Sequence, residues 1–388
     1  MDLGLDRVHG ALAEVGNPHA HCTAIHIAGS NGKGSTSAMV ESIARAAGLR
    51  TGMYTSPHLA RFAERIRIAG DPIQDAPFDA ALSAALHTQK GTLTFFECLT
   101  VAAFIAFAEA HVDLAVIEVG LGGRLDATNV IERPLACAIT SISLEHTAVL
   151  GNTLGAIARE KAGILKPHCP YVLGALPAEA ENAIDEAAQS VGAGPKWTTP
   201  VTVGKVGLVG PHQRQNASVA TALAMLAASH FPGILKGIES GIAQTKWPGR
   251  YEKLPTERNI TLLFDGAHNP EGAHALAGAL AEEKLDPQRT TLLFGALADK
   301  SYVDVLRLVA YTSSKRVYTS PQGRAPAPLT SLAQTAPGEM IDNPQTALKR
   351  AVELTPSGGT VVITGSLYLV GEVRAYALQL PIDPVIPL

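Results

Sequence analysis

A glycine-rich segment between an apolar strand and a helix limits the possible folds of this chain more than any other stretch. Ile25 and Ile27 have the alternation of a strand, and the sequence Gly29-Ser30-Asn31-Gly32-Lys33-Gly34-Ser35-Thr36 follows immediately. Residues 37–43 then continue with helical spacing. A strand, a tight turn and a helix in this order are typical of a parallel α/β sheet with an anion site at the helix N-terminus.

The residue types in this segment suit nucleotide phosphates. Backbone amides at the helix N-terminus would face the anion, Lys33 would add a positive charge, and Ser35 or Thr36 would offer a hydroxyl to Mg²⁺. The spacing departs from the standard P-loop, because Gly34 separates Lys33 from Ser35. A purely structural turn is the alternative, but a lysine and two hydroxyls in this context favour phosphate. The candidate nucleotide-binding residues of this segment are Gly29, Asn31, Gly32, Lys33, Gly34, Ser35 and Thr36.

Composition narrows the class of protein. The chain has 388 residues, of which 46% are hydrophobic and 17% charged, as expected for a compact α/β enzyme of two domains. Its net charge of −4, without a local cluster of Lys and Arg, argues against nucleic acid as a partner. The N-terminus lacks a signal-peptide pattern, and no apolar stretch reaches the roughly 18 residues that cross a bilayer. We therefore expect a cytoplasmic protein that does not bind membranes.

Strand and helix patterns alternate along the whole chain. Residues 246–250 form a proline–glycine break, at which we place the boundary between a domain of residues 1–248 and one of residues 249–388. Residues 201–209 interrupt the alternation with glycine-punctuated segments that we predict to be short β-strands. The expected fold is α/β, with a P-loop-type, mostly parallel sheet domain followed by a smaller Rossmann-like α/β domain.

Three chemically useful side chains lie near the ends of predicted strands. Glu118 ends the apolar run of residues 113–119, His146 follows the strand predicted over 134–141, and Lys161 lies in the helix predicted over 156–165. Ligands of open parallel sheets bind beyond the carboxyl ends of the strands, so these groups can converge on the glycine-rich segment. A carboxylate and an imidazole near a triphosphate suit Mg²⁺. Each residue taken alone could be structural.

Other candidate residues have equally ordinary explanations. Phe95 and Phe96, beside Glu97, could belong to the core at a helix start, or could stack on a planar ligand. Asp126 could cap a turn. Arg250, Asp265 and His268 could be a helix cap and surface charges. The residues themselves leave these alternatives open.

Ten motifs in order resemble the folylpolyglutamate synthase and dihydrofolate synthase family, which is related to the Mur ligases. They are IHIAGSNGKGSTS, TSPHLARFAERI, TFFECLT, EVGLGGRLDATN, EKAGI, GPHQRQNA, PGRYE, DGAHNP, GALADK and GSLYLVGEVR, and they run nearly from end to end. The resemblance implies a Mur ligase-like fold and an ATP-dependent carboxylate–amine ligase. Residues 1–248 would bind ATP and the pterin, and residues 249–388 would provide the glutamate side and close on ATP.

The resemblance also implies a set of site residues. Those implied to carry the chemistry are Lys33, His146 and Lys161, with Lys161 modified by CO₂ to a carbamate. Those implied to contact ATP, in addition to the glycine-rich segment, are Asn216, Arg250, Asp265 and His268. Those implied to bind Mg²⁺ are Ser56, Glu118 and His146. Those implied to hold the pterin are Thr94, Phe95, Phe96, Glu97, Leu125, Asp126 and Ala127.

The implied reaction adds L-glutamate to dihydropteroate, to the glutamate tail of a reduced folate, or to both, through an acyl phosphate. Another Mur-type amide ligase and a nucleotide-binding regulatory protein without catalysis are the alternatives. Glu145 and Ser301 stand where the family usually has Asp. The sequence leaves open which folate reaction occurs, the tail length and self-association, with a monomer as the expectation.

Overall fold

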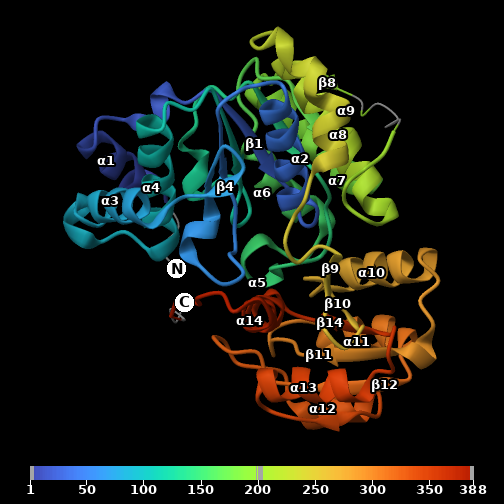
Figure 1. The fold of residues 1–388 in the computed structure, drawn as a ribbon. Coiled ribbons are helices and arrows are strands. Elements are labelled where there is room, and N and C mark those ends of the chain that lie inside the picture. Colours follow the sequence, from blue (N-terminus) through green and yellow to red (C-terminus); the bar gives the residue numbers. More distant parts are fainter. Residues whose placement is uncertain (1–3, 198, 200–203, 385–388) are drawn as a thin grey trace. The chain divides into compact units, whose positions relative to one another are not determined.

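The computed structural model describes residues 4–197, 199 and 204–384, which form two compact units (Figure 1). The first unit contains the described residues up to Pro57, together with Phe62–Gly207 and Gln213–Lys246. The second contains His58–Arg61, Leu208–His212 and the described residues from Trp247 onward. Two short pieces of chain before Trp247 therefore belong to the second unit.

The first unit is built on a mostly parallel sheet. Its strands within the described residues are β1 (Ala24–Ala28), β2 (Thr51–Tyr54), β3 (Ile66–Ile68), β4 (Asp71–Pro72), β5 (Leu114–Glu118), β6 (Ala136–Ile139), β7 (Tyr171–Leu173) and β8 (Lys196–Trp197). Their order in the sheet is β4-β3-β2-β5-β1-β6-β7-β8. The pairs β2–β3 and β3–β4 are antiparallel, and the other pairs are parallel. The strand that precedes the glycine-rich segment is therefore central, between β5 and β6.

Helices cover this sheet (Figure 1). Those described are α1 (Asp6–Glu14), α2 (Lys33–Ala46), α3 (Asp75–Leu86), α4 (Phe95–Glu109), α5 (Thr147–Leu150), α6 (Leu154–Ala162), α7 (Ala178–Val191), α8 (Pro211–Ala227) and α9 (Ile238–Gln244). Helix α2 begins at Lys33, so the last residues of the glycine-rich segment form its first turn. That first turn is where unpaired amides are available to an anion.

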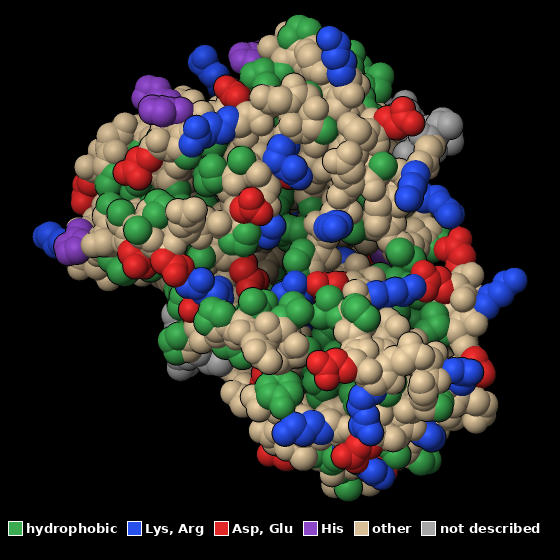
Figure 2. All heavy atoms as spheres, in the orientation of Figure 1, with side chains coloured by type: hydrophobic (Ala, Val, Ile, Leu, Met, Phe, Trp, Pro, Cys, Tyr) green, Lys and Arg blue, Asp and Glu red, His purple; other side chains and the backbone are tan. Residues whose placement is uncertain are grey.

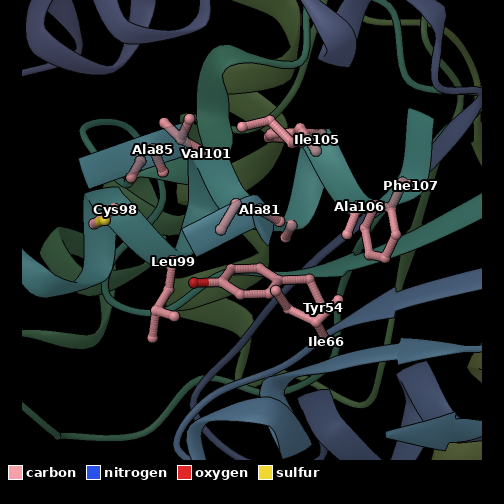
Figure 3. Close-up of a cluster of buried hydrophobic side chains, with 14 of the residues drawn as sticks. Tyr54, Ile66, Ala81, Ala85, Cys98, Leu99, Val101, Ile105, Ala106 and Phe107 are labelled. Carbon is pink, nitrogen blue, oxygen red and sulfur yellow. The ribbon is translucent and has the colours of Figure 1, made fainter. Parts of the chain in front are cut away.

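A cluster of buried side chains joins α3 and α4 to the sheet (Figure 3). Helix α4 is apolar on nearly all sides, and its Leu99 and Phe107 are fully buried. Tyr54 of β2 lies in the same cluster with no exposed surface. A Cβ on Gly52 would lie 2.7 Å from Cδ1 of Phe107, so the ring packs directly on the strand backbone. Burial of each such side chain contributes about 1.5–3 kcal/mol to the free energy of unfolding.

The second unit has a smaller α/β sheet of its own. Its described strands are β9 (Glu252–Pro255), β10 (Thr261–Phe264), β11 (Thr290–Phe294), β12 (Lys315–Tyr318), β13 (Glu339–Met340) and β14 (Thr360–Thr364), in the order β13-β12-β11-β14-β10-β9. Only β9, at the edge, pairs antiparallel among these described strands. The described helices are α10 (Pro270–Glu282), α11 (Tyr302–Val309), α12 (Leu329–Thr335), α13 (Pro344–Leu354) and α14 (Leu367–Leu378).

The predicted α/β class with two sheets is confirmed, whereas one local prediction is wrong. Within the predicted β region 201–209, residues 201–203 lie outside the described part, and residues 204–209 form no strand. Gly204 has a φ of 122°, and the amide of Gly207 donates to the carbonyl of Ile242 at 2.9 Å. This stretch therefore packs as a loop against α9 and lacks a neighbouring strand.

Figure 2 shows acidic and basic side chains interspersed on the visible face. In the described part of the chain, no helix combines the length and apolar character that a membrane span requires.

Candidate functional site

The glycine-rich segment forms a loop between β1 and α2 that approaches its neighbours very closely. Gly29 and Gly32 have φ values of 148° and 84°, in the region that favours glycine. A Cβ on Gly29 would lie 2.0 Å from Oγ1 of Thr140, and one on Gly32 would lie 2.4 Å from Oδ1 of Asn216. Neither position can therefore take a side chain without moving the loop. The predicted nucleotide contact Asn216 lies directly against this loop.

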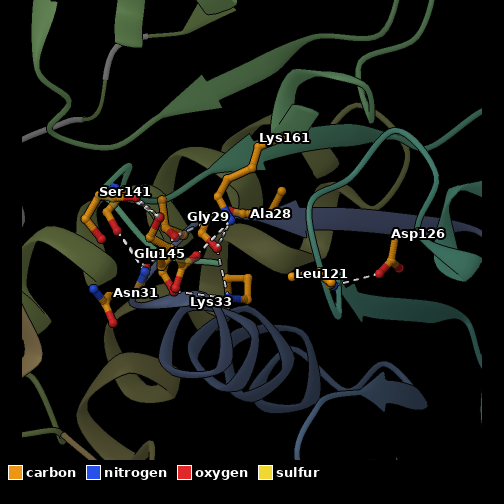
Figure 4. A network of polar contacts seen from close by, with 12 residues as sticks. Ala28, Gly29, Asn31, Lys33, Leu121, Asp126, Ser141, Glu145 and Lys161 are labelled. Carbon is orange, nitrogen blue, oxygen red and sulfur yellow. Dashed lines mark hydrogen bonds and ion pairs between the residues drawn. The ribbon is translucent and has the colours of Figure 1, made fainter. Parts of the chain in front are cut away.

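Polar residues that follow β6 hold the loop in place (Figure 4). The amide of Asn31 donates to Oγ of Ser141 at 2.9 Å, and Oγ1 of Thr140 donates to the carbonyl of Asn31 at 2.6 Å. The amide of Ser143 donates to Oγ of Ser30 at 3.0 Å. The conformation of the loop is thus fixed from the neighbouring strand, which is a preorganised arrangement for binding an anion.

At the start of α2, the side chains of Lys33 and Ser35 already make hydrogen bonds within the described part of the protein, whereas the hydroxyl of Thr36 does not. Nζ of Lys33 donates to the carbonyls of Gly29 and Ser30 at 2.8 and 3.1 Å. Oγ of Ser35 accepts a hydrogen bond from Nε2 of Gln213 at 3.3 Å. Oγ1 of Thr36 is buried and has no hydrogen-bond partner among the described residues. A buried hydroxyl left without a partner fits a site that receives a phosphate oxygen or a hydrated cation. The sequence offered Gln213 only as part of a motif, without a role.

Lys161 and Glu145 form a buried ion pair beside the same loop (Figure 4). Nζ of Lys161 lies 3.0 Å from Oε1 of Glu145 and 2.9 Å from the carbonyl oxygen of Gly29. Burial, with the positive charge of Lys33, lowers the pKa of Lys161 to about 8, and Glu145 opposes part of this shift. Burial acts to raise the pKa of Glu145, but Lys33 and Lys161 together lower it to about 2. Glu145 is therefore ionised at neutral pH.

The predicted metal ligands come from loops after neighbouring strands. Ser56 follows β2, and its amide donates to Oε2 of Glu118, the last residue of β5, at 3.3 Å. His146 lies beyond β6 with a φ of 48°, immediately before α5. Within residues 4–197, 199 and 204–384, no group of three or more His, Cys, Asp or Glu side chains could hold a metal ion. A cation here would need the hydroxyl of Ser56 and oxygens of a bound phosphate.

The predicted pterin segment 94–97 begins α4 and is held by a residue that the sequence did not single out. Oγ1 of Thr94 accepts from the amide of Glu97, and the carboxylate of Glu97 accepts from the amide of Thr94 at 2.7 Å, which is a capping box. Nη2 of Arg7, on α1, donates to Oε1 of Glu97 at 2.8 Å. Burial acts to raise the pKa of Glu97, but Arg7 and Thr94 lower it below its usual value. Glu97 therefore anchors the helix start.

The two predicted phenylalanines have different surroundings. The centroid of the Phe95 ring lies 5.1 Å from the centroid of the Phe62 ring. It also lies 5.3 Å from Cζ of the Arg65 guanidinium. The ring of Phe96 lies 6.0 Å from that of Tyr54 and is only partly buried. A Cβ on Gly120 would lie 2.4 Å from Cζ of Phe96. Phe96 therefore packs on Gly120, five residues before the other predicted pterin segment.

The other predicted pterin segment, residues 125–127, is held by hydrogen bonds to the carboxylate of Asp126. Asp126 accepts from the amide of Leu121 at 2.8 Å, and from the amide and hydroxyl of Thr128 at 3.0 and 2.5 Å. Burial raises the pKa of Asp126 above its usual value, although hydrogen bonds from Thr128 and Leu121 act in the opposite direction. Leu125 remains partly exposed, and Ala127 is buried. The carboxylate of Asp126 thus shapes the segment from within.

The same segment is tied to the end of the helix that carries Lys161. Nδ2 of Asn129 donates to the carbonyls of Arg124 and Gly163, each at 3.0 Å. A Cβ on Gly163 would lie 2.4 Å from Cα of Arg124, so the two backbones are in contact. The loops predicted to hold pterin and the helix predicted to carry the carbamate are therefore one packed structure.

The remaining predicted residues lie together in the second unit. The carboxylate of Asp265, after β10, accepts from the amides of Tyr251 and Ala267, each at 3.0 Å. Burial raises the pKa of Asp265, and Arg250 opposes this shift. A Cβ on Gly266 would lie 2.2 Å from Nη1 of Arg250, and Nδ1 of His268 lies 2.8 Å from the carbonyl oxygen of Gly266. These residues form one cluster, whose contact with a nucleotide stays a prediction.

Comparison with known proteins identifies relatives of both parts of the chain. Residues 27–194 match the family described as the Mur ligase middle domain, and residues 249–367 match the Mur ligase, glutamate ligase domain. The chain is 33% identical to the dihydrofolate synthase/folylpolyglutamate synthase of Bacillus subtilis, over 96% of this chain and 94% of that protein.

Solved structures agree with this relationship. The structure of E. coli FolC in complex with DHPP and ADP is 30% identical, with a TM-score of 0.83, and the match covers 98% of this chain and 94% of that chain. A bifunctional folylpolyglutamate synthase/dihydrofolate synthase with Mn, AMPPNP and L-glutamate bound is 31% identical, with a TM-score of 0.85. That match covers 98% of this chain and 95% of that one.

Proposed function

The chain belongs to the folylpolyglutamate synthase and dihydrofolate synthase family of Mur ligases, and from this we propose that it joins L-glutamate to a pteroyl substrate at the expense of ATP. The substrate is dihydropteroate, a reduced folate with a glutamate tail, or both. One observation carries the proposal within the molecule. Lys33 and Lys161 converge on the carbonyl of Gly29, in a loop where Gly29 and Gly32 lie directly against Thr140 and Asn216.

The reaction needs two steps and no covalent bond to the enzyme. The substrate carboxylate attacks the γ-phosphorus of ATP, which gives an acyl phosphate and ADP. The amine of L-glutamate then attacks the acyl carbon, and inorganic phosphate leaves from the tetrahedral intermediate. Lys33 and the amides of the loop would stabilise the phosphoryl group in flight, so positioning and electrostatics provide most of the rate.

A divalent cation fits the proposed site. A related structure has Mn, AMPPNP and L-glutamate bound, and Ser56, Glu118 and His146 would hold Mg²⁺ in this chain. When bound, the cation would neutralise charge on the phosphates. The buried, unpartnered Oγ1 of Thr36, within the described residues, is consistent with an oxygen-rich ligand at this position.

Lys161 is proposed to act as a carbamate. The ammonium group would first lose one proton, and the neutral amine would then add to the carbon of CO₂ and lose a second proton, so the side chain would change from a cation to an anion. Two features of this chain support the step. Burial and Lys33 lower the pKa of Lys161 to about 8, which increases the neutral fraction. A second cation beside Lys33 is also electrostatically unfavourable.

ADP formation should depend on both co-substrates, because phosphate transfer requires the pteroyl carboxylate and turnover requires capture of the acyl phosphate by glutamate. We expect ADP release with ATP, Mg²⁺, L-glutamate and either dihydropteroate or a reduced folate monoglutamate, tested separately. Omission of either co-substrate should lower the steady-state rate to background.

The same assay separates the alternatives. Folded protein that binds ATP but releases no ADP with either pteroyl substrate would point to the regulatory protein. Turnover that depends on a different carboxylate substrate would point to another Mur-type amide ligase.

Phe96→Ala should weaken pterin binding selectively. Stacking of a base-like ring on an aromatic side chain contributes about 1–3 kcal/mol, so the KM for the pteroyl substrate should rise roughly 5-fold to 150-fold. The KM for ATP should stay nearly constant. Phe107→Leu is the matched control, because Phe107 lies on the same helix but is fully buried. A lower melting temperature with unchanged KM in Phe96→Ala would instead identify Phe96 as a core residue.

A further inference from the structure

A buried chain of three side chains connects the central strand to the predicted pterin segment. Nε2 of His26, on β1, lies 2.8 Å from Oγ1 of Thr128, which lies 2.5 Å from Oδ1 of Asp126. His26 and Thr128 have no exposed surface, and Asp126 is 5% exposed. The first of these hydrogen bonds joins residues that are 102 positions apart in sequence. We call these three residues the His26 chain.

The protons of the His26 chain can be assigned from its chemistry. Both carboxylate oxygens of Asp126 accept from backbone amides, those of Leu121 and Thr128, so the single hydroxyl proton of Thr128 also points to Asp126. The lone pair of that hydroxyl must then accept from Nε2–H of His26, which fixes the imidazole in the Nε2–H tautomer. Nδ1 of His26 is buried without a hydrogen-bond partner among the described residues, and an acceptor without a partner agrees with an unprotonated nitrogen at this position. Burial lowers the pKa of His26 to about 3, so the ring is neutral at physiological pH.

The position of His26 gives this chain a mechanical role. His26 lies three residues before Gly29, and it pairs in register with Ile117 of β5 and Cys137 of β6. It is therefore part of the rigid strand from which the phosphate loop departs. Thr128 lies in the short 3₁₀ turn Ala127–Val130, for which Asp126 is the N-cap. The hydrogen bond between His26 and Thr128 ties this turn to the strand, in addition to the bonds that Asn129 makes to Arg124 and Gly163.

An apolar residue would fill the position of His26 at lower desolvation cost, since a buried imidazole with one unsatisfied nitrogen is expensive. The hydrogen bonds from His26 to Thr128 and from Thr128 to Asp126 instead favour a role for His26 in orienting the Asp126 carboxylate. We propose that His26 and Thr128 are positioning residues for pteridine recognition, which act by fixing the Asp126 carboxylate and with it the segment 125–127. The inference deepens the proposed function and rests on it. It assigns a role to two residues that do not belong to the predicted substrate contacts.

The test compares Thr128→Val, which removes the hydroxyl at nearly constant shape, with Thr128→Ser, which keeps it. A hydrogen bond to a charged group typically corresponds to a change of about tenfold or more in binding. We expect Thr128→Val to raise the KM for the pteroyl substrate roughly 10-fold, with the KM for ATP within about twofold of wild type. Thr128→Ser should restore most of the loss. His26→Leu should show the same selective change in a smaller degree, because Thr128 can still donate to Asp126.

Thr291→Val is the matched control. Thr291 is a fully buried strand threonine of the second unit, and its hydroxyl accepts from Thr355 at 2.7 Å. This variant should lose thermal stability without a selective change in KM. Equal changes in both KM values, or a Thr128→Val variant that differs from wild type only in melting temperature, would overturn the positioning role.

A second measurement does not depend on catalysis. Nitrogen NMR of ¹⁵N-labelled histidine should show His26 as the Nε2–H tautomer from pH 5 to 8, with its signal shifted in Thr128→Val. An Nδ1–H tautomer, or a signal unaffected by Thr128→Val, would show that the His26 chain does not exist as inferred. If wild-type protein forms no ADP with either pteroyl substrate, the proposed function fails. The NMR result then still decides whether the chain is present.

Discussion

The Lys161→Ala variant should keep its fold and lose on the order of 10²-fold or more in kcat, by comparison with deletion of one preorganised electrostatic group. The side chain has almost no contact with solvent and points at the loop that is proposed to hold the phosphates. Loss of the carbamate would remove a negative group from the cation site, and in the unmodified protein the substitution would also remove the ammonium that pairs with Glu145. Steady-state kinetics and thermal denaturation would measure the two effects separately.

Arg159→Ala is the control for Lys161→Ala. Arg159 lies on the same helix and carries the same sign of charge, but its side chain is exposed and pairs with Glu186 at 3.1 Å. It should have nearly wild-type kcat. Small carboxylates such as acetate should restore part of the activity of Lys161→Ala and none of any loss in Arg159→Ala. A fully active Lys161→Ala enzyme would rule out the carbamate.

Glu145 gives the carbamate a second, independent test. Its negative charge raises the pKa of Lys161, and it would also repel a carbamate. Glu145→Gln should therefore increase the neutral fraction of the amine at neutral pH, and a ¹³CO₂ adduct at Lys161 should be more populated in the ¹³C NMR spectrum. As pH falls below about 8, the adduct of the wild-type protein should decrease, because protonation removes the neutral amine. An adduct that is unaffected by both changes would have to lie elsewhere.

The features predicted correctly from the sequence have local signals. The glycine-rich segment combines strand alternation, glycines and helical spacing within about twenty residues, and the alternation of strands and helices gives the α/β class. Helix α4 similarly begins with a capping box that can be recognised at i and i+3. Edge strands such as β4 and β9 carry weak patterns, because they are short and largely solvated: both residues of β4 are exposed, and those of β9 alternate between half-buried and exposed.

Contacts between distant side chains left no comparable signal. Glu145 was noticeable only as a departure from a family pattern, and nothing near it indicated an ion pair with Lys161. Arg7 is 90 residues from Glu97 in sequence, and a single arginine on an amphipathic helix predicts no particular partner. His26 resembled an ordinary strand residue. Such contacts depend on which strands become neighbours in the sheet. They are therefore set by the topology and cannot be predicted from the periodicity of apolar residues.

Lys33→Met should lower kcat by a similar factor, on the order of 10²-fold to 10³-fold, because Lys33 supplies the positive charge nearest to the proposed phosphates. The change in stability should be small, since the hydrogen bonds of Lys33 to the carbonyls of Gly29 and Ser30 are half exposed and local in sequence. Arg45→Met is the control, because Arg45 is a cation near the other end of α2 and pairs with Glu41. Single-turnover measurement of ADP formation would show whether phosphoryl transfer itself is slowed.

Combination of Lys33→Met with Lys161→Ala should give a loss smaller than the product of the two single losses. The positive charge of Lys33 lowers the pKa of Lys161, so its removal raises that pKa and decreases the neutral amine available to CO₂. Part of the loss in Lys33→Met should thus arise through Lys161, and a double-mutant cycle in kcat would show this coupling. Elevated CO₂ should recover part of the activity of Lys33→Met, since mass action opposes the loss of neutral amine. Strictly multiplicative losses with no response to CO₂ would show that Lys33 acts on phosphate alone and that the charge state of Lys161 does not depend on it.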